Sequence, residues 1–243
     1  MSQLRSKPQN PWTVDGILRK KAGVATRTPF MARLVDPTEI GMVRNLARLV
    51  AEWVPDKTVF RALPDEEFDS FFAGEGCAVG VFAEGLLLAY GLLSFPGSDG
   101  DNIGRLLGLG REQLAMVAQL ESSAVHPDYQ GNGLQETIIR YRMDYARHAG
   151  FLHAVGHVSP RNPISLANVL ECGLYGKRLA ERKPGYLRFI CHREMMSPGK
   201  LIEGSGREIS LDNLAAQEGA LAEGLWAYHF DKAGKSVSYG RFQ

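Results

Sequence analysis

One stretch of sequence decides the fold: VHPDYQGNGLQ, at residues 125–135. It joins a strand-like run over residues 116–125 to the clearest helical pattern of the chain. That helix is predicted over residues 134–149, with an apolar stripe made of Leu134, Ile138, Tyr141 and Tyr145. A short loop between a strand and a helix leaves backbone N–H groups pointing outward at the positive end of the helix dipole. Gly131 and Gly133 allow close approach to the backbone, so the loop is predicted to bind a phosphate.

Two other phosphate-binding loops do not fit this stretch. A dinucleotide-binding loop requires the pattern GxGxxG, and only Gly131 and Gly133 are present. A P-loop requires Gly-Lys followed by Ser or Thr, and the stretch contains no lysine. The remaining alternative is a plain turn between a strand and a helix.

Apolar periodicity and turn signals predict an ordered series of elements on both sides of this stretch. Strands are predicted over residues 30–35, 78–83, 86–95, 152–158, 175–179, 186–193, 226–230 and 236–242. Helices are predicted over residues 40–50, 64–72 and 211–225, and from Pro163 until Gly173; a short helix is one interpretation of residues 14–21. This order, with βαβ units at its centre, predicts an α/β sheet of mixed direction covered by helices on both faces.

The chain is predicted to fall into three segments. Residues 1–29 carry six basic residues against one acid, and they are interpreted as a basic, flexible leader. Residues 30–196 form the main globular domain. Residues 197–243 form a C-terminal extension that consists of a helix and a hairpin.

Bulk composition narrows the class of protein. The formal net charge of +1 gives no sign of a nucleic-acid partner. No run approaches the ~20 apolar residues of a membrane span, and no apolar signal segment begins the chain. The three cysteines are far apart in sequence and odd in number, which argues against a zinc motif and a disulfide framework. These features predict a cytoplasmic protein without a membrane or nucleic-acid partner.

The stretch at residues 125–135 resembles the cofactor loop of the GNAT superfamily of N-acetyltransferases, which reads V-x-P-x-Y-(Q/R)-G-x-G-L-G. The positions that match in register are Val125, Pro127, Tyr129, Gln130, Gly131, Gly133 and Leu134. Gln135 departs from the pattern, because the family has a small residue there. A second family motif, N-x-x-S followed by a helix, matches Asn162 and Ser165. The order of elements agrees with the family over residues 30–194.

The resemblance implies a GNAT-like mixed β-sheet, splayed at its centre and flanked by helices, with the extension added at its C-terminal end. It also implies an acyl-CoA-dependent N-acyltransferase that uses acetyl-CoA or another acyl-CoA and no metal. The residues implied to bind this co-substrate are Ser123, Ala124, Val125, Gln130, Gly131, Asn132, Gly133, Leu134, Gln135, Asn162 and Ser165. A helix cap explains Asn162 equally well.

Direct attack by an amine in a ternary complex requires two proton transfers, and the resemblance suggests a residue for each. Glu121 lies on the strand before the loop, where many members of the family carry an acid, and it is the candidate base. The alternative is an ordinary charged residue of a strand. The position of the family's tyrosine acid is occupied by Val169, so Tyr175 is the candidate acid, with packing in a hairpin as the alternative.

The acceptor is expected to be a primary amine of a small molecule. Residues 97–105 join two central strands and are predicted to cover the acceptor site, where Asp99 and Asp101 would attract a cation; a solvated loop is the alternative. His153 and His157 share one face of a strand without a third metal ligand, and they are interpreted as structural.

Two other functions stay open at this point. One is acyl or aminoacyl transfer from a carrier protein, which the extension would dock. The other is a non-catalytic module that binds acyl-CoA. The extension is also a candidate homodimer interface, because exposed strand edges invite pairing.

Overall fold

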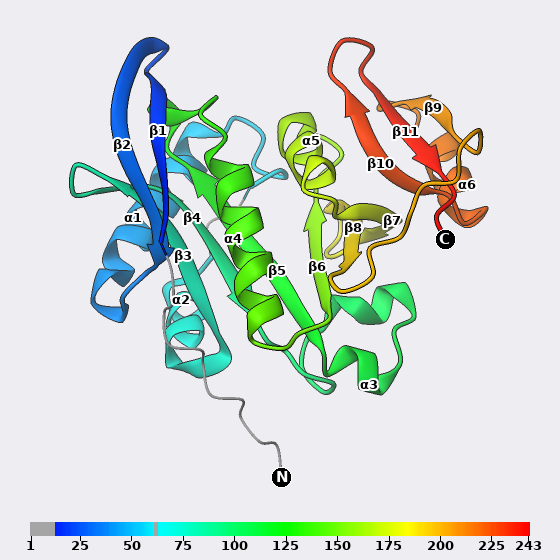
Figure 1. Ribbon diagram of the computed structural model, residues 1–243, viewed down its shortest axis with the longest axis horizontal. Coiled ribbons are helices and arrows are strands. Elements are labelled where there is room, and N and C mark those ends of the chain that lie inside the picture. The colour runs from blue at the N-terminus through cyan, green and yellow to red at the C-terminus, as the bar shows by residue number, and fades with distance from the viewer. Residues whose placement is uncertain (1–12, 61–62) are drawn as a thin grey trace. The chain divides into compact units, whose positions relative to one another are not determined.

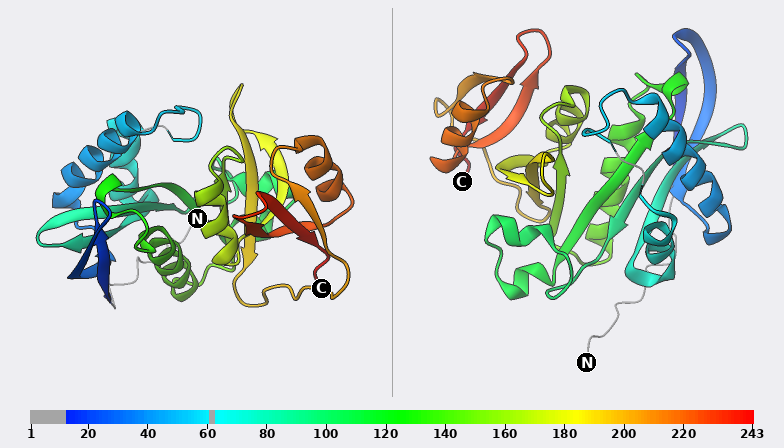
Figure 2. Two further views of the ribbon diagram at one scale, coloured as in Figure 1. Left: turned by 90° about the horizontal axis from the view of Figure 1, so that it is seen from above. Right: turned by 180° about the vertical axis from the view of Figure 1, so that it is seen from behind.

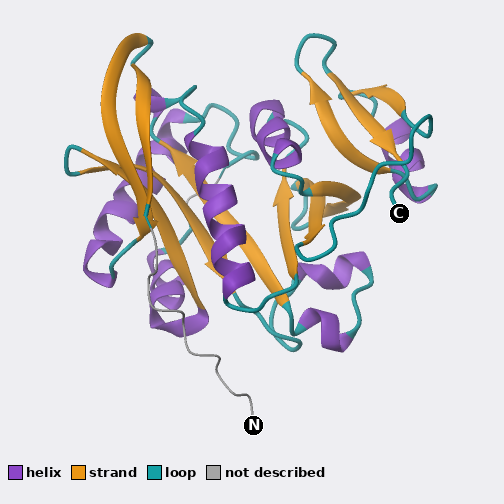
Figure 3. Ribbon diagram, viewed as in Figure 1, coloured by secondary structure: helices purple, strands orange, loops and turns teal. Residues whose placement is uncertain are grey.

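The computed structural model describes residues 13–60 and 63–243, and these residues divide into two units (Figure 1). The first unit contains residues 13–55, 63–95 and 120–151. The second contains residues 56–60, 96–119 and 152–243. Both units combine β-strands with helices (Figure 3), so the predicted mixed α/β fold class is confirmed.

The first unit is a sheet with the strand order β1-β2-β3-β4-β5. Its strands are β1 (Val14–Lys21), β2 (Val24–Leu34), β3 (Gly76–Ala83), β4 (Leu86–Ser94) and β5 (Val117–Val125), the last of which begins in the second unit. Neighbouring strands from β1 to β4 are antiparallel. Figures 1 and 2 show α4 (Leu134–His148) on one face, with α1 (Ile40–Trp53) and α2 (Asp65–Ser70) on the other.

Local sequence signals explain most of these elements. Asp36 caps a 3-10 turn (Pro37–Glu39) that leads into α1, and Glu39 completes a capping box with it. Glu84 and Gly85, with φ angles of 51° and 77°, form the turn between β3 and β4. The apolar stripe predicted for α4 is buried along its whole length.

The second unit has the strand order β6-β8-β7-β10-β11-β9. These strands are β6 (His153–Val158), β8 (Leu187–Glu194), β7 (Tyr175–Glu181), β10 (Trp226–Asp231), β11 (Ser236–Gly240) and β9 (Arg207–Ser210). Its helices are η3 (Ile103–Leu107), α3 (Arg111–Leu114), α5 (Pro163–Glu171) and α6 (Leu214–Ala222). The core beneath η3 consists of Ile103, Val117, Val155 and Ile190.

The predicted C-terminal helix and hairpin are present, and β10 extends the sheet by pairing with β7. The sequence did not predict β9, which is four residues long and buries only Ile209. So short a strand has no periodicity to detect. Its pairing with β11 is what defines it.

The prediction for the N-terminal segment is wrong over residues 14–29. β1 and β2 form a hairpin there, in place of a flexible leader or a short helix. Ala22 and Gly23 form its turn, with φ angles of 48° and 80°. Leu18 is fully buried, while its neighbours in β1 are mostly exposed polar residues. The packing of this one apolar side chain holds in place a strand whose composition alone predicts a flexible tail. The part of that prediction on residues 1–12 lies outside the described residues.

Among residues 13–60 and 63–243, no helix is both long enough and apolar enough to cross a membrane. The boundaries of the domain over residues 30–196 and of the extension stay predictions, as does the cytoplasmic location.

Candidate functional site

The loop at residues 130–135 has the backbone geometry expected of an anion site. Gly131 and Gly133 adopt φ angles of 76° and 71°, a region that residues with a Cβ rarely enter. Gly133 is the N-cap of α4, and no side chain caps the helix. The first N–H groups of a helix have no acceptor within the helix, so the loop presents donors where the helix dipole is positive. Both glycines are exposed, which leaves the backbone open to a phosphate.

The side chain of Asn132 holds this loop to the N-terminal hairpin. Its Oδ1 accepts hydrogen bonds from the backbone N–H groups of Arg19 and Lys20, at 2.7 and 3.0 Å. Its Nδ2 donates to the carbonyl oxygens of Lys20 and Tyr129, both at 2.8 Å. Asn132 is therefore engaged in positioning the loop, and it is the loop's backbone that remains for the cofactor.

Two further contacts join β1 to the turn that precedes the loop. The N–H of Ala22 donates to the carbonyl oxygen of Asp128 at 2.6 Å. The ammonium group of Lys21 lies 5.7 Å from the centre of the Tyr129 ring, which is buried. The hairpin that sequence reasoning missed is thus part of the framework of the predicted cofactor site.

Glu121 lies on β5, which leads directly into this loop. Its Oε1 accepts a hydrogen bond from Ser94 Oγ at 3.2 Å, and Ser122 Oγ lies 3.1 Å from the hydroxyl of Tyr90. Ser94 and Tyr90 are four residues apart on β4 and face the same side. Two consecutive residues of β5 thus have hydrogen-bond partners on one face of β4, and Ser94 helps to hold the carboxylate of Glu121.

A buried arginine fixes the strands around Glu121. Arg142 of α4 is 2 % exposed, and its Nη1 donates to the carbonyl oxygens of Leu92 and Glu121 at 2.8 and 3.2 Å. Its Nε donates to the carbonyl of Ile138 at 3.2 Å. Gly91 makes room for it, because a Cβ there would lie 2.7 Å from the guanidinium carbon. This clamp joins α4, β4 and β5 through groups that no local pattern reveals.

Comparison with known proteins agrees with this geometry. A family model described as "Acetyltransferase (GNAT) family" matches residues 46–174, which is more than half of the chain. The chain belongs to the GNAT family of acetyltransferases. It is accordingly an N-acyltransferase that depends on an acyl-CoA, and the predicted family is confirmed. A search of curated proteins found no match.

Solved structures of GNAT proteins share the fold. A GNAT-family acetyltransferase from Streptococcus pneumoniae is 13 % identical with a TM-score of 0.53, and the match covers 68 % of this chain and 98 % of that one. The ribosomal-protein-S18-alanine N-acetyltransferase of Escherichia coli is 13 % identical with a TM-score of 0.52, covering 68 % and 94 %. A Salmonella typhimurium protein solved with its cofactor acetyl-CoA has the same identity, TM-score and coverages as the Escherichia coli enzyme.

The predicted GNAT site residues fall in both units. The first unit contains Glu121, Ser123, Ala124, Val125 and residues 130–135, which lie on β5, in the loop before α4 or at the start of α4. The second unit contains Asn162, Ser165 and Tyr175. Asn162 is the N-cap of α5, and its Oδ1 accepts from the N–H of Ser165 at 3.1 Å. The capping interpretation of Asn162 is thereby confirmed, and its contact with the cofactor stays a prediction.

Tyr175 packs in an aromatic cluster with the extension. Its ring centre lies 4.6 Å from that of Phe242 and 6.4 Å from that of Trp226, and Trp226 stacks on Phe242 at 4.9 Å. Lys177 lies 3.4 Å from the centre of the Trp226 ring. These contacts support the packing alternative, and the acid role of Tyr175 stays a prediction.

His153, His192 and the three cysteines have structural surroundings. His153 is buried, and its Nδ1 lies 3.1 Å from His192 Nε2; burial lowers the pKa of both imidazoles, that of His192 to about 3. The three cysteines are buried and unbridged. In the described part of the chain, no cluster of three or more His, Cys, Asp or Glu side chains could hold a metal ion.

The acids predicted to attract a cationic acceptor already have partners. Asp99 pairs with Arg111 at 3.2 Å, and Asp101 pairs with Arg182 at 3.1 Å. Asn102 between them is buried and donates to the carbonyl oxygens of Gly97 and Leu114, which anchors the loop. The loop is therefore held by its own polar contacts, and both carboxylates form exposed ion pairs. Their role at the acceptor site stays a prediction.

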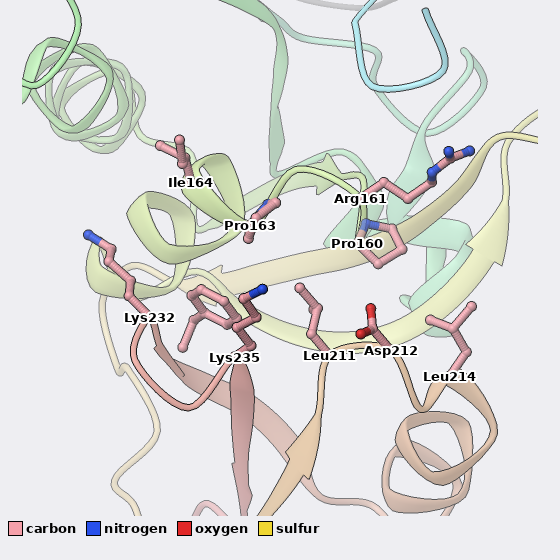
Figure 4. A pocket seen from close by; sticks show the side chains of 10 residues that line it. Pro160, Arg161, Pro163, Ile164, Leu211, Asp212, Leu214, Lys232 and Lys235 are labelled. Carbon is pink, nitrogen blue, oxygen red and sulfur yellow. The ribbon is translucent and has the colours of Figure 1, made fainter. Parts of the chain in front are cut away.

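A cavity of about 610 Å³ lies in the second unit (Figure 4). Its lining comes from the segment before and at the start of α5 and from the extension: Pro160, Arg161, Pro163, Ile164, Leu211, Asp212, Leu214, Phe230, Lys232 and Lys235. None of the predicted site residues lines it. The cavity therefore lies between the start of α5 and the extension.

Proposed function

We propose that this GNAT enzyme transfers an acetyl group from acetyl-CoA to a primary amine of a small molecule, by direct attack in a ternary complex. The observation that carries the proposal is the loop at residues 130–135. Its two glycines with positive φ, its exposed backbone and its place at the start of a 15-residue helix suit a pyrophosphate. The N-terminal hairpin holds the loop in this shape before any ligand binds, which lowers the cost of ordering on binding.

Each residue has a proposed role in this scheme. The backbone of Gly131, Gly133 and Leu134 holds the pyrophosphate, and the strand residues Ser123 to Val125 hold the arm that carries the thioester. Acetyl-CoA supplies an activated acetyl group, and the chain supplies position and proton transfer. Attack requires a neutral amine, so a base must take a proton from the ammonium form of the acceptor.

Glu121 is the proposed base, acting through a water molecule. Its residue is only partly buried, and the hydrogen bond from Ser94 Oγ helps to fix the position of its carboxylate. The hydroxyl of Tyr175 is the proposed proton donor for the leaving thiolate. Its contacts in the aromatic cluster are those of a packing residue, so Tyr175→Phe is the direct test of that role.

Two measurements test the function. Isothermal titration with acetyl-CoA should show binding that Gly131→Pro abolishes, because proline cannot adopt a φ near +76°. Release of free thiol from acetyl-CoA is then measured with a panel of primary amines and no carrier protein. Transfer to at least one amine supports the proposal. Binding of acetyl-CoA with transfer only when a carrier protein is added would replace it with carrier-dependent acyl transfer.

A further inference from the structure

A buried cation in the second unit has no acidic partner. Arg188 of β8 is 9 % exposed, and among the described residues no carboxylate lies within ion-pair distance of it. Its Nη1 donates to the carbonyl of Leu187 at 2.8 Å and its Nη2 to the carbonyl of Thr58 at 2.6 Å. Burial lowers the pKa of its guanidinium, against the opposing effect of Tyr186 and Asp56, but an arginine remains protonated at neutral pH. Burying an unpaired charge is costly.

The strand register places other basic groups on the same face. His157 of β6 is directly opposite Ile190 of β8, and Ile190 is two residues from Arg188. Arg188 is opposite Ala180 of β7, two residues before Arg182. Arg182 directly follows the last residue of β7, and its N–H continues the pairing by donating to the carbonyl oxygen of Tyr186 at 3.1 Å. Residues that pair directly, and residues two apart in a strand, face the same side. His157, Arg188 and Arg182 therefore line one face of this sheet.

Solvent reaches this face, and the imidazole there is uncharged. His157 is exposed, although the protein around it and then Arg182 and Arg188 lower the pKa of its ring to about 4. A neutral imidazole at pH 7 adds no positive charge, and it can donate one hydrogen bond to a ligand. The positive charge of the face resides in the guanidinium groups.

The nearby carboxylates already form ion pairs with other arginines. Asp101 pairs with Arg182 at 3.1 Å, with its own side chain 86 % exposed. Asp56 pairs with Arg161 at 3.1 Å, and it also accepts from the N–H and the hydroxyl of Thr58 at 2.9 and 2.7 Å. Of the described arginines Arg161, Arg182 and Arg188, only the buried Arg188 has no carboxylate within ion-pair distance. The side chain that lacks a counter-ion is the one that an incoming anion would stabilise most.

We propose that Arg188, with Arg182 and His157 beside it, binds an anionic group of the acceptor, a carboxylate or a phosphate, so that the acceptor is a small amine that also carries such a group. This inference rests on the proposed function. The sequence suggested that acids would attract a cationic acceptor, whereas this inference assigns the binding of an anion to arginines. Asp99 and Asp101 are each paired with an arginine. A guanidinium suits a carboxylate or phosphate because its donors form a planar fork.

The first test does not depend on knowing the acceptor. With CoA saturating, so that phosphate sites for the cofactor are filled, the melting temperature is measured in sodium phosphate and in sodium chloride of equal ionic strength. Phosphate should stabilise the wild type by mass action, and Arg188→Gln and Arg182→Gln should lose that increment. Arg207→Gln, which removes an exposed arginine paired with Glu223 in the same unit, should keep it. Equal melting temperatures of the wild type in both salts overturn the inference.

The second test determines whether the bound anionic group belongs to the acceptor. Rates are compared for amine pairs that differ only in charge, such as an amino acid and its amide, or phosphoethanolamine and ethanolamine. The wild type should prefer the anionic member, and Arg188→Gln should lower kcat/KM for that member by about 10- to 100-fold, the range for a lost charge-assisted hydrogen bond. The neutral member should change far less. Arg188→Lys, which keeps the charge, should recover part of the loss and controls for folding.

Other outcomes separate this inference from the proposed function. If Arg188→Gln instead weakens acetyl-CoA binding and leaves the acceptor preference intact, the anion belongs to the cofactor and the inference fails. If the wild type acetylates neutral and anionic amines equally well, the inference fails while the proposed function stands. If acetyl-CoA binds but no free amine is acetylated, the proposed function fails irrespective of the phosphate result.

Discussion

Replacing Asn132 by alanine would test whether the N-terminal hairpin shapes the cofactor loop. The substitution removes four hydrogen bonds between 2.7 and 3.0 Å, two accepted by Oδ1 and two donated by Nδ2. Three of the four involve exposed groups that water can satisfy after the change, so the loss lies well below four full hydrogen bonds. We expect the free energy of unfolding to fall by about 1–2 kcal/mol.

The same substitution should also weaken the binding of acetyl-CoA. If the loop must be reordered when acetyl-CoA binds, up to about 1.4 kcal/mol of that loss appears as a rise in Kd of up to tenfold. Urea unfolding measures the stability, and isothermal titration with acetyl-CoA measures the Kd. Asn213→Ala is the matched control, because Asn213 caps α6 through one hydrogen bond at 3.1 Å. It should cost about 1 kcal/mol of stability and leave the Kd unchanged.

Asn132→Asp separates the shape of the loop from its charge. The aspartate keeps both acceptor contacts to Arg19 and Lys20, but it adds a negative charge beside the predicted pyrophosphate site. Its Kd for acetyl-CoA should exceed that of the alanine variant, and added salt should reduce the difference. An unchanged Kd in both variants would refute the reasoning, since neither the hairpin contact nor the local charge would then affect the cofactor.

Three further changes have definite expected outcomes. Glu121→Gln should lower turnover by about 10²-fold or more and shift the acidic limb of the pH–rate profile, because the amide cannot accept a proton; an unaltered profile would remove Glu121 as the base. Gly91→Ala should destabilise the fold by about 1–3 kcal/mol, since the new Cβ would lie 2.7 Å from the guanidinium carbon of Arg142; an unchanged urea midpoint would contradict the clamp. Leu18→Ala should cost about 2–5 kcal/mol, because this side chain is fully buried, whereas a flexible leader would tolerate the change without loss.

Much of the fold was predictable because its signals are local. The helix α4 is visible in a stripe of four apolar residues, and the caps at Asp36 and Asn162 are read from a residue and its next few neighbours. Positive φ angles at Gly131 and Gly133 follow from the residue type and the turn that it must make. The hairpin over β1 and β2 escaped prediction because β1 has one buried side chain, Leu18, and one residue gives no period that distinguishes a strand from a tail.

The sequence by itself determined the mixed α/β architecture, the family and the loop that suits a pyrophosphate. The tertiary structure alone decided which side chains surround that loop and which charges are left unpaired. Asn132 meets backbone groups 112 and 113 residues away, and Arg188 meets a carbonyl 130 residues away. Such partners depend on strand order and register, which arise from packing of the whole sheet, whereas helix periods, caps and glycine turns depend only on residues adjacent in the chain.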